Sequence, residues 1–212
     1  FVDDRPVGRI VARMSPLEDE AGAPIGMLGF FECGADAVAA GALFDDAIAW
    51  LRERRSGRIV GPMDGDTWHR YRVNAGPFAR APFPLEPWNP PYYSALWEGH
   101  GFATLETYSS KWIDDVAVLL PALEAGLGRA GDRGVRIRQL RRDRLRDELA
   151  LVHDLSSRIF ADAFLYSPIS REAFLAMYAG MESFLDPELV LFAETDAGEH
   201  VGSVFAYDVL SR

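Results

Sequence analysis

The stretch that decides the fold runs from Ile25 to Met63 and reads, in three pieces, IGMLGFFEC, GADAVAAGALFDDAIAWLRERRSG and RIVGPM. The first piece is an apolar run long enough for a buried strand, and the last is a second short strand entered through Gly57. The middle piece has helical spacing, and its apolar face comprises Phe44, Ala47, Ile48, Trp50 and Leu51. Strand, helix and strand within about 40 residues predict a βαβ unit with parallel strands and a right-handed crossover.

Ligands of open α/β sheets bind beyond the carboxyl ends of the strands. The turn from Cys33 to Val38, between the first strand and the helix, is therefore the first place to look for a bound ligand. A helix N-terminus favours an anion because its first N–H groups are unpaired and its dipole is positive there.

The composition excludes several classes of function. The 212 residues carry a formal net charge of −10, which disfavours nucleic acid and anionic membranes as partners, so we predict neither nucleic acid nor membrane binding. The single cysteine excludes an internal disulfide and indicates a reducing compartment, so the predicted location is cytoplasmic. No apolar run reaches the roughly 18 residues that a membrane-spanning helix requires.

Further elements are expected on both sides of the βαβ unit. The segments with strand-like spacing are 7–14, 102–113, 135–140, 189–193 and 201–207. The segments with helical spacing are 92–99, 114–130, which contains Pro121, 143–164, and a last helix that Ser170 opens as N-cap. Between the βαβ unit and the next helix, 64–91 is rich in aromatic residues and holds six prolines, which is typical of a lid or binding loop.

The pattern restarts after the glycines at 131 and 134. Strand, two helices and a hairpin do not complete a domain of the first kind, so we interpret them as the start of a second one. The predicted organisation is a first module at 1–115, a helical linker at 116–134 and the first part of a second module at 135–212. We interpret the chain as a piece of a longer protein.

Two matches indicate a family. The segment YSALWEGHGF, at 93–102, resembles the short helix and Gly-Phe that close the acyl-CoA site of the GNAT acetyltransferases. FFEC, WLR, GPM, NPPYY and GHGF together look like tandem-GNAT proteins of bacteria. The resemblance implies a GNAT-like α/β fold, with a mixed, mostly antiparallel sheet flanked by helices, and most of one module followed by the first part of a second.

The resemblance implies acyl transfer from acetyl-CoA to a small amine or amino-acid-like acceptor, with a base that removes the amine proton and an acid that protonates the thiolate. The turn that would bind the cofactor, Cys33, Gly34, Ala35 and Asp36, departs from the family pattern because it has one glycine, no basic residue and a carboxylate. Asp36 suits a helix N-cap instead. Trp97 stands where the family has a tyrosine acid, and an indole N–H only donates.

The catalytic residues stay unassigned, with Glu32, His69 and Tyr93 as candidates. Glu32 is either a base that reaches the substrate or a carboxylate at the edge of a cleft. The cluster DGDTWHRYR, at 64–72, either lines an acceptor pocket or is a loop pinned by its aromatic residues. The substrate-binding candidates are Asp64, Thr67, Trp68, His69, Tyr71, Arg72, Asn89 and Tyr92. No metal site is predicted, and His100, His153 and His200 are interpreted as surface residues.

Two functions from different classes follow. The first is an acyl-CoA-dependent N-acyltransferase whose acyl-CoA site lies in the second module beyond Arg212, with the two modules packed together. The second is a non-catalytic binding or scaffold module that keeps the GNAT fold without the chemistry.

Overall fold

The computed structural model describes residues 5–83, 85–180 and 185–206, which form two compact units. Unit 1 comprises Phe1–Tyr108 with Phe164–Ser167, and unit 2 comprises Ser109–Ala163 with Pro168–Arg212. Each unit has its own small sheet, so the chain is a mixed α/β protein. That these units are two copies of one module stays a prediction.

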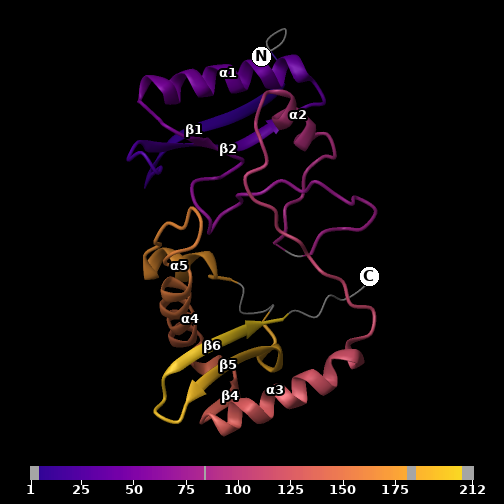
Figure 1. The fold of residues 1–212 in the computed structure, drawn as a ribbon, viewed down its shortest axis with the longest axis vertical. Coiled ribbons are helices and arrows are strands. Elements are labelled where there is room, and N and C mark those ends of the chain that lie inside the picture. Colours follow the sequence, from indigo (N-terminus) through magenta and orange to yellow (C-terminus); the bar gives the residue numbers. More distant parts are fainter. Residues whose placement is uncertain (1–4, 84, 181–184, 207–212) are drawn as a thin grey trace. The chain divides into compact units, whose positions relative to one another are not determined.

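Unit 1 contains the predicted βαβ arrangement. Its elements are β1 (Gly8–Glu18), β2 (Pro24–Cys33), α1 (Ala37–Glu53), β3 (Ile59–Val60) and α2 (Tyr93–Gly99). The strand order is β1-β2-β3, with β1 antiparallel to β2 and β2 parallel to β3, as the sequence predicted for the second pair. Figure 1 shows α1 lying along the pair of strands β1 and β2.

The core of unit 1 lies between α1 and the sheet. The buried face of α1 consists of Ala40, Phe44, Ala47 and Leu51, in agreement with most of the predicted stripe. These side chains pack against Leu28, Phe31 and Trp97. Trp50, predicted to widen the stripe, is exposed and lies beneath the guanidinium of Arg54, 3.7 Å from the ring centroid.

A β-bulge in β2 decides which side chains face this core. Arg9 of β1 pairs with Glu32 and Val11 pairs with Gly29, so β2 contains one extra residue at this point, and Phe30 has a φ of 50°. With strict alternation from Leu28, residue 32 would face α1. The bulge instead turns Phe31 toward α1 and leaves Glu32 on the opposite face.

The predicted strand at 102–113 is wrong, because the structure has no regular secondary structure there. Phe102 packs on Phe44 and Trp97, with ring centroids 5.5 and 4.9 Å away. Beyond it Leu105, Tyr108, Trp112 and Ile113 are exposed. An alternating sequence becomes a strand only when another backbone pairs with it, and within the described residues none does.

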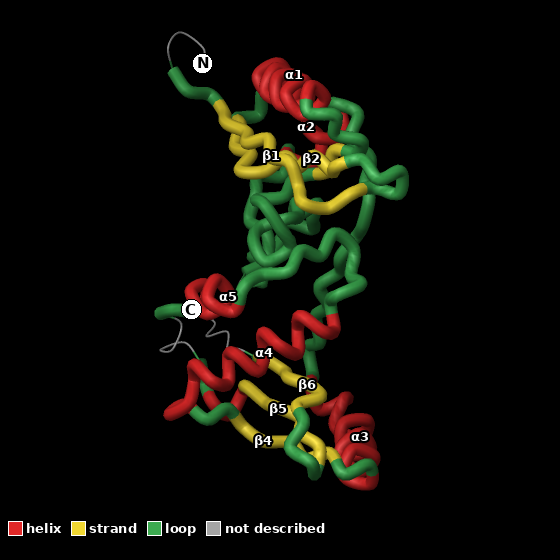
Figure 2. The backbone as a smooth tube through the Cα atoms, turned by 90° about the vertical axis from the view of Figure 1, so that its left-hand side faces the viewer, coloured by secondary structure: helices red, strands yellow, loops and turns green. Residues whose placement is uncertain are grey.

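Unit 2 contains β4 (Val135–Gln139), α4 (Leu145–Ile159), α5 (Arg171–Met177), β5 (Val190–Thr195) and β6 (His200–Phe205). Before β4 lie the 3-10 turn η1 (Val116–Leu119) and α3 (Leu120–Asp132), and the 3-10 turns η2 (Arg142–Arg144) and η3 (Pro187–Leu189) precede α4 and β5. The strands are antiparallel in the order β4-β5-β6. Figure 2 shows α4 running across one face of this sheet.

Several boundaries in unit 2 differ from the prediction. The helix predicted at 143–164 ends at Ile159, and the one predicted at 114–130 consists of η1 followed by α3. Pro121 lies in the first turn of α3, where a proline is tolerated because its missing N–H would have no partner. Ser170 caps α5, and the hairpin is present, although Tyr207 of its predicted second strand lies outside the described residues.

None of the helices among the described residues combines the length and the apolarity needed to cross a lipid bilayer.

Candidate functional site

The candidate site lies where the end of β2 separates from β3. The two strands pair at Gly26–Ile59 and Met27–Val60, and the N–H of Met63 then donates to the carbonyl of Leu28 at 2.7 Å. After this point the N–H of Phe30 donates to the Asp64 carboxylate instead, at 2.5 Å. The Asp64 side chain thus accepts the hydrogen bond that the backbone of β3 would otherwise accept. Glu32 follows this point on β2 and lies at the opening where the two strands have separated.

The end of β2 can approach the chain after β3 because residue 29 is glycine. A Cβ atom at Gly29 would lie 2.1 Å from the carbonyl oxygen of Met63, well inside van der Waals contact. The two backbones therefore pass each other at a distance that no other residue permits.

Glu32 and Tyr93 form the central pair of the site. The Tyr93 hydroxyl donates to Glu32 Oε2 at 2.7 Å and accepts the backbone N–H of Cys33 at 3.3 Å. Burial raises the pKa of Tyr93 to about 12, and the hydrogen bond to Glu32 adds to this effect. Tyr93 therefore stays protonated at neutral pH, while the half-exposed carboxylate of Glu32 can accept a proton from a bound molecule.

Two arginines face the other oxygen of Glu32. Arg9 Nη2 lies 3.9 Å and Arg70 Nη2 lies 3.7 Å from Glu32 Oε1. Arg70 also donates through Nε to Asp64 Oδ2 at 3.1 Å, and its carbonyl accepts the N–H of Asp64 at 2.7 Å. The loop from 64 to 70 is thereby closed on itself and holds a guanidinium beside Glu32. The contacts of the two arginines with Glu32 are too exposed to add much stability, but they balance the charge of the Glu32 carboxylate.

A small cavity lies beside Tyr93. Its volume is about 30 Å³, enough for roughly two water molecules. The lining residues are Phe31, Pro62, Asp64, Arg70, Arg72, Val73, Pro87, Trp88, Asn89, Tyr93 and Trp97. The indole Nε1 of buried Trp97 has no hydrogen-bond partner among the described residues. An unpaired buried donor costs about 1–3 kcal/mol, and Nε1 itself is out of reach of solvent.

The predicted site residues divide into two groups. Glu32, Tyr93 and Asp64 converge on the opening, and Arg72 and Asn89 line the cavity. Asn89 also fastens its loop to Asn74, accepting its N–H at 2.6 Å and donating to its carbonyl at 3.1 Å.

The other predicted residues lie away from the cavity lining. His69 donates its backbone N–H to Asp66, and its Nδ1 lies 2.7 Å from the same carboxylate oxygen, which also accepts the N–H of Trp68. Thr67 lies inside this turn. Tyr71 packs edge-to-face against Tyr108, with ring centroids 5.8 Å apart, and burial raises the pKa of Tyr71.

Arg70 lies in the site but is absent from the candidates that the sequence named, which include Arg72. Arg72 pairs with Glu86 at 3.6 Å, whereas Arg70 reaches Glu32. The spacing of the two arginines carries no signal that separates them, because the loop decides which of them turns toward β2.

The turn at the start of α1 is occupied by its own side chain. Asp36 Oδ1 accepts the N–H groups of Val38 at 2.9 Å and Ala39 at 3.1 Å, so Asp36 is the N-cap. Burial raises the pKa of the Cys33 thiol, and the charge of Asp36 raises it further, so the thiol is a poor nucleophile. Tyr92 donates its hydroxyl to the Cys33 carbonyl at 3.1 Å. Binding of a cofactor by Cys33–Asp36 stays a prediction.

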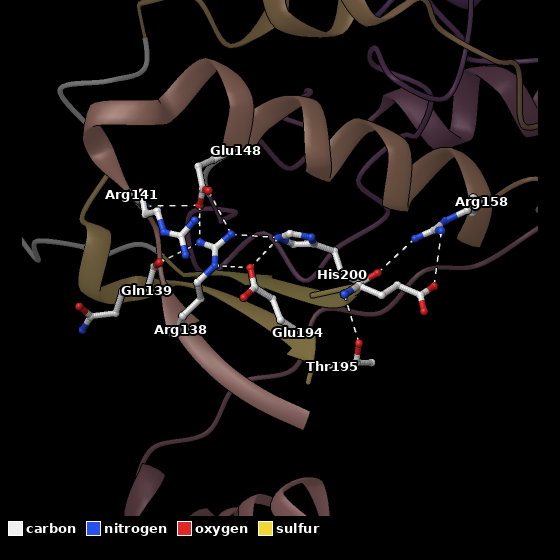
Figure 3. Close-up of polar contacts among 9 residues, drawn as sticks. Arg138, Gln139, Arg141, Glu148, Arg158, Glu194, Thr195 and His200 are labelled. Carbon is white, nitrogen blue, oxygen red and sulfur yellow. Dashed lines mark hydrogen bonds and ion pairs between the residues drawn. The ribbon is translucent and has the colours of Figure 1, made fainter. Parts of the chain in front are cut away.

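Unit 2 contains a second cluster of charged groups, centred on Arg138 (Figure 3). Arg138 Nη2 donates to Glu148 Oε1 at 3.0 Å, and Nη1 donates to the other oxygen of Glu148 and to the carbonyl of Gln139. Its Nε donates to Glu194, and Nη2 lies 2.9 Å from His200 Nε2. Four of the five N–H groups of the guanidinium thus donate to oxygen atoms, and the fifth lies beside His200 Nε2.

This cluster fastens α4 to the sheet. Burial lowers the pKa of Arg138, but the hydrogen bonds that it donates to Glu148 and Glu194 outweigh this effect and raise the pKa overall. The hydrogen bond from Arg138 in turn lowers the pKa of Glu194. Because these groups satisfy one another, we interpret the cluster as structural.

The interpretation of two histidines as surface residues is wrong. His200 Nε2 lies 2.8 Å from Glu194 in the Arg138 cluster, and His153 Nε2 lies 2.9 Å from the carbonyl of Ile169, with both rings mostly buried. His100 packs on Phe44, 5.0 Å between centroids. Within the described ranges no group of three His, Cys, Asp or Glu side chains is placed to bind a metal ion.

Comparison with known proteins found one informative similarity. The chain is 25% identical over 202 residues to a protein named bacterial ceramide synthase, from Caulobacter vibrioides. The match covers 94% of this chain and 52% of that protein, so the chain spans about half the length of its relative. No protein-family model matches the chain, and no solved structure matches it.

Proposed function

We propose that this chain is, or forms part of, an acyltransferase that transfers an acyl group from a thioester to an amine. A ceramide is the amide of a long-chain amino alcohol and a fatty acid, so the name of the relative describes the formation of an amide bond. The observation that carries the proposal is the hydrogen-bonded pair of Glu32 and Tyr93 at the opening of the sheet.

The pair supplies the two proton transfers that amide formation needs. Attack of the amine on the thioester carbonyl breaks the C–S bond, and the amine loses one proton while the thiolate gains one. Glu32 is the base that takes the amine proton, since its carboxylate is accessible at the opening. Once Glu32 is protonated, its hydrogen bond with Tyr93 can reverse direction, and Tyr93 can give its own proton to the thiolate. Transfer of the Glu32 proton to Tyr93 restores both groups.

Arg70 has a positioning role in this proposal, since it would orient the carboxylate of Glu32. The donor class is a coenzyme A thioester such as acetyl-CoA, and the acceptor is a small or amphiphilic amine. The cavity is too small to enclose either, so both would lie across its mouth.

The second candidate function is a binding module without catalysis. It is favoured by Asp36, whose carboxylate accepts two N–H groups at the N-terminus of α1 that a phosphate would use. Calorimetric titration of the chain with acetyl-CoA and with coenzyme A separates the two functions. Acyltransferase activity requires heat of binding from the thioester, and its absence favours the binding module.

The catalytic proposal is tested by thiol release from an acyl-CoA in the presence of an amine. Glu32→Gln and Tyr93→Phe should each lower the rate about 10²–10⁴-fold, the usual contribution of a positioned acid or base. The matched control is Glu20→Gln, which alters a surface pair with Arg58 in the same unit. Rates of all three variants within twofold of one another would overturn the assignment.

A further inference from the structure

We infer that the loop at residues 77–83 and 85–88 of unit 1 docks on a lipid surface, from which an amphiphilic amine reaches the site. Four large apolar side chains of this loop are exposed. Leu85 is 76% and Trp88 is 72% exposed, and Phe78 and Phe83 are about two-fifths exposed. Apolar side chains gathered on one surface segment mark an interaction site, whereas single exposed ones are ordinary.

The backbone conformation of Leu85 supports a role for its side chain in contacting a binding partner. Its φ of 69° lies in the left-handed region, which a leucine adopts at a cost of strain and which asparagine or glycine adopts more readily. A bulky apolar residue that is both strained and exposed gains nothing for the folded unit itself. Its side chain is placed where an external apolar phase could receive it.

The composition of the loop favours a bilayer interface over a protein partner. Its sequence PFARAPFPLEPW has four prolines, which have no N–H group to leave unpaired in an apolar medium. Tryptophan is enriched at the level of lipid headgroups.

The charge of the loop favours neutral lipids. Its two charged residues are Arg80 and Glu86, and Glu86 is paired with Arg72 at 3.6 Å. The loop can therefore approach uncharged headgroups, whereas the net charge of −10 on the chain opposes approach to anionic ones. The composition-based exclusion of membranes thus holds for anionic bilayers only.

The loop is continuous with the candidate site. Pro87 and Trp88 line the cavity that Tyr93 and Trp97 also line, and Asn89 fastens the end of the loop to Asn74. An amine with an apolar tail could keep its tail in the lipid while its polar end reaches Glu32. This step rests on the proposed function, whereas the lipid surface itself rests on exposure and charge.

The experiment is flotation of the full chain with vesicles of pure phosphatidylcholine, without acyl donor. The wild type should float with them, and less so when phosphatidylglycerol is added. Leu85→Asn, which suits the left-handed backbone, should weaken the apparent partition about tenfold, the order expected for withdrawing one leucine from an apolar phase. The control is Val38→Asn, at another highly exposed apolar residue in the first turn of α1, and it should float like the wild type.

Failure of the wild type to float, or equal flotation of Leu85→Asn, overturns the lipid surface. A change of molecular mass by light scattering in Leu85→Asn, without vesicle binding by the wild type, overturns it in favour of a protein interface. Flotation without any thiol release supports the surface and counts against the proposed function. Thiol release with a short soluble amine, without flotation, supports the proposed function and overturns the lipid surface.

Discussion

Replacing Arg138 with methionine leaves the buried carboxylate of Glu148 without its counter-charge, and it also removes the arginine partner of Glu194. Glu148 is 2% exposed, and in the folded chain both of its oxygens accept hydrogen bonds from the guanidinium. In Arg138→Met the hydrogen bond that Glu148 retains among the described residues is the 3.4 Å contact from the N–H of Arg141. Methionine keeps most of the side-chain volume, so the change removes charge more than packing.

The expected magnitude follows from burial. Breaking one side of a buried ion pair costs about 3–5 kcal/mol, whereas an exposed pair contributes about 0–1 kcal/mol. The matched control lies two residues away on the same strand. Arg136 pairs with Asp196 at 3.3 Å and both side chains are mostly exposed, so Arg136→Met should cost less than about 1 kcal/mol.

The assay is urea unfolding of the full chain followed by circular dichroism, with hydrogen exchange of the β4–β6 amides to assign the transition to unit 2. Since the free energy of unfolding of a domain is typically about 5–15 kcal/mol, Arg138→Met should remove a large part of it. Equal destabilisation by Arg138→Met and Arg136→Met would refute the reasoning, because burial would then not decide the energy. The double variant Arg138→Met/Glu148→Leu should be more stable than Arg138→Met alone, as the unpaired charge is gone.

Three other predictions concern unit 1. Gly29→Ala should destabilise it by about 3 kcal/mol because the new Cβ meets the Met63 carbonyl, whereas Gly34→Ala, which meets open space, should stay within about 1 kcal/mol in the same urea assay. Tyr93 should ionise with a pKa of about 12 in an ultraviolet titration. Since this exceeds the unfolded value of about 10, its stabilising effect should be complete below pH 10 and disappear as the pH rises through 12. Loss of that alkaline decrease in stability in Tyr93→Phe is the check. Asp36→Asn keeps an N-cap and removes a negative charge, so unfolding should be nearly unchanged while acetyl-CoA affinity, measured by calorimetry, rises about two- to fivefold; unchanged affinity would place the phosphates elsewhere.

The sequence by itself determined the elements whose causes are local. The βαβ order, the N-caps Asp36 and Ser170 and the hairpin of β5 and β6 were all predicted, because each depends on the spacing of apolar residues or on a side chain that bonds its own turn. The strand predicted at 102–113 failed for the complementary reason. Strand formation needs a partner backbone, and alternation alone does not report one.

Only the tertiary structure decided the chemistry of the site. Glu32 and Tyr93 are 61 residues apart, and a one-residue bulge in β2 turns Glu32 away from the core and toward the opening. The Arg138 cluster joins three strands and a helix in the same way. From the sequence alone, a charged side chain is predicted to be exposed, because burial of a charge is favourable only when residues distant in the sequence pair with it. The fold brings these partners together, and no local sequence pattern predicts which distant residues will pair.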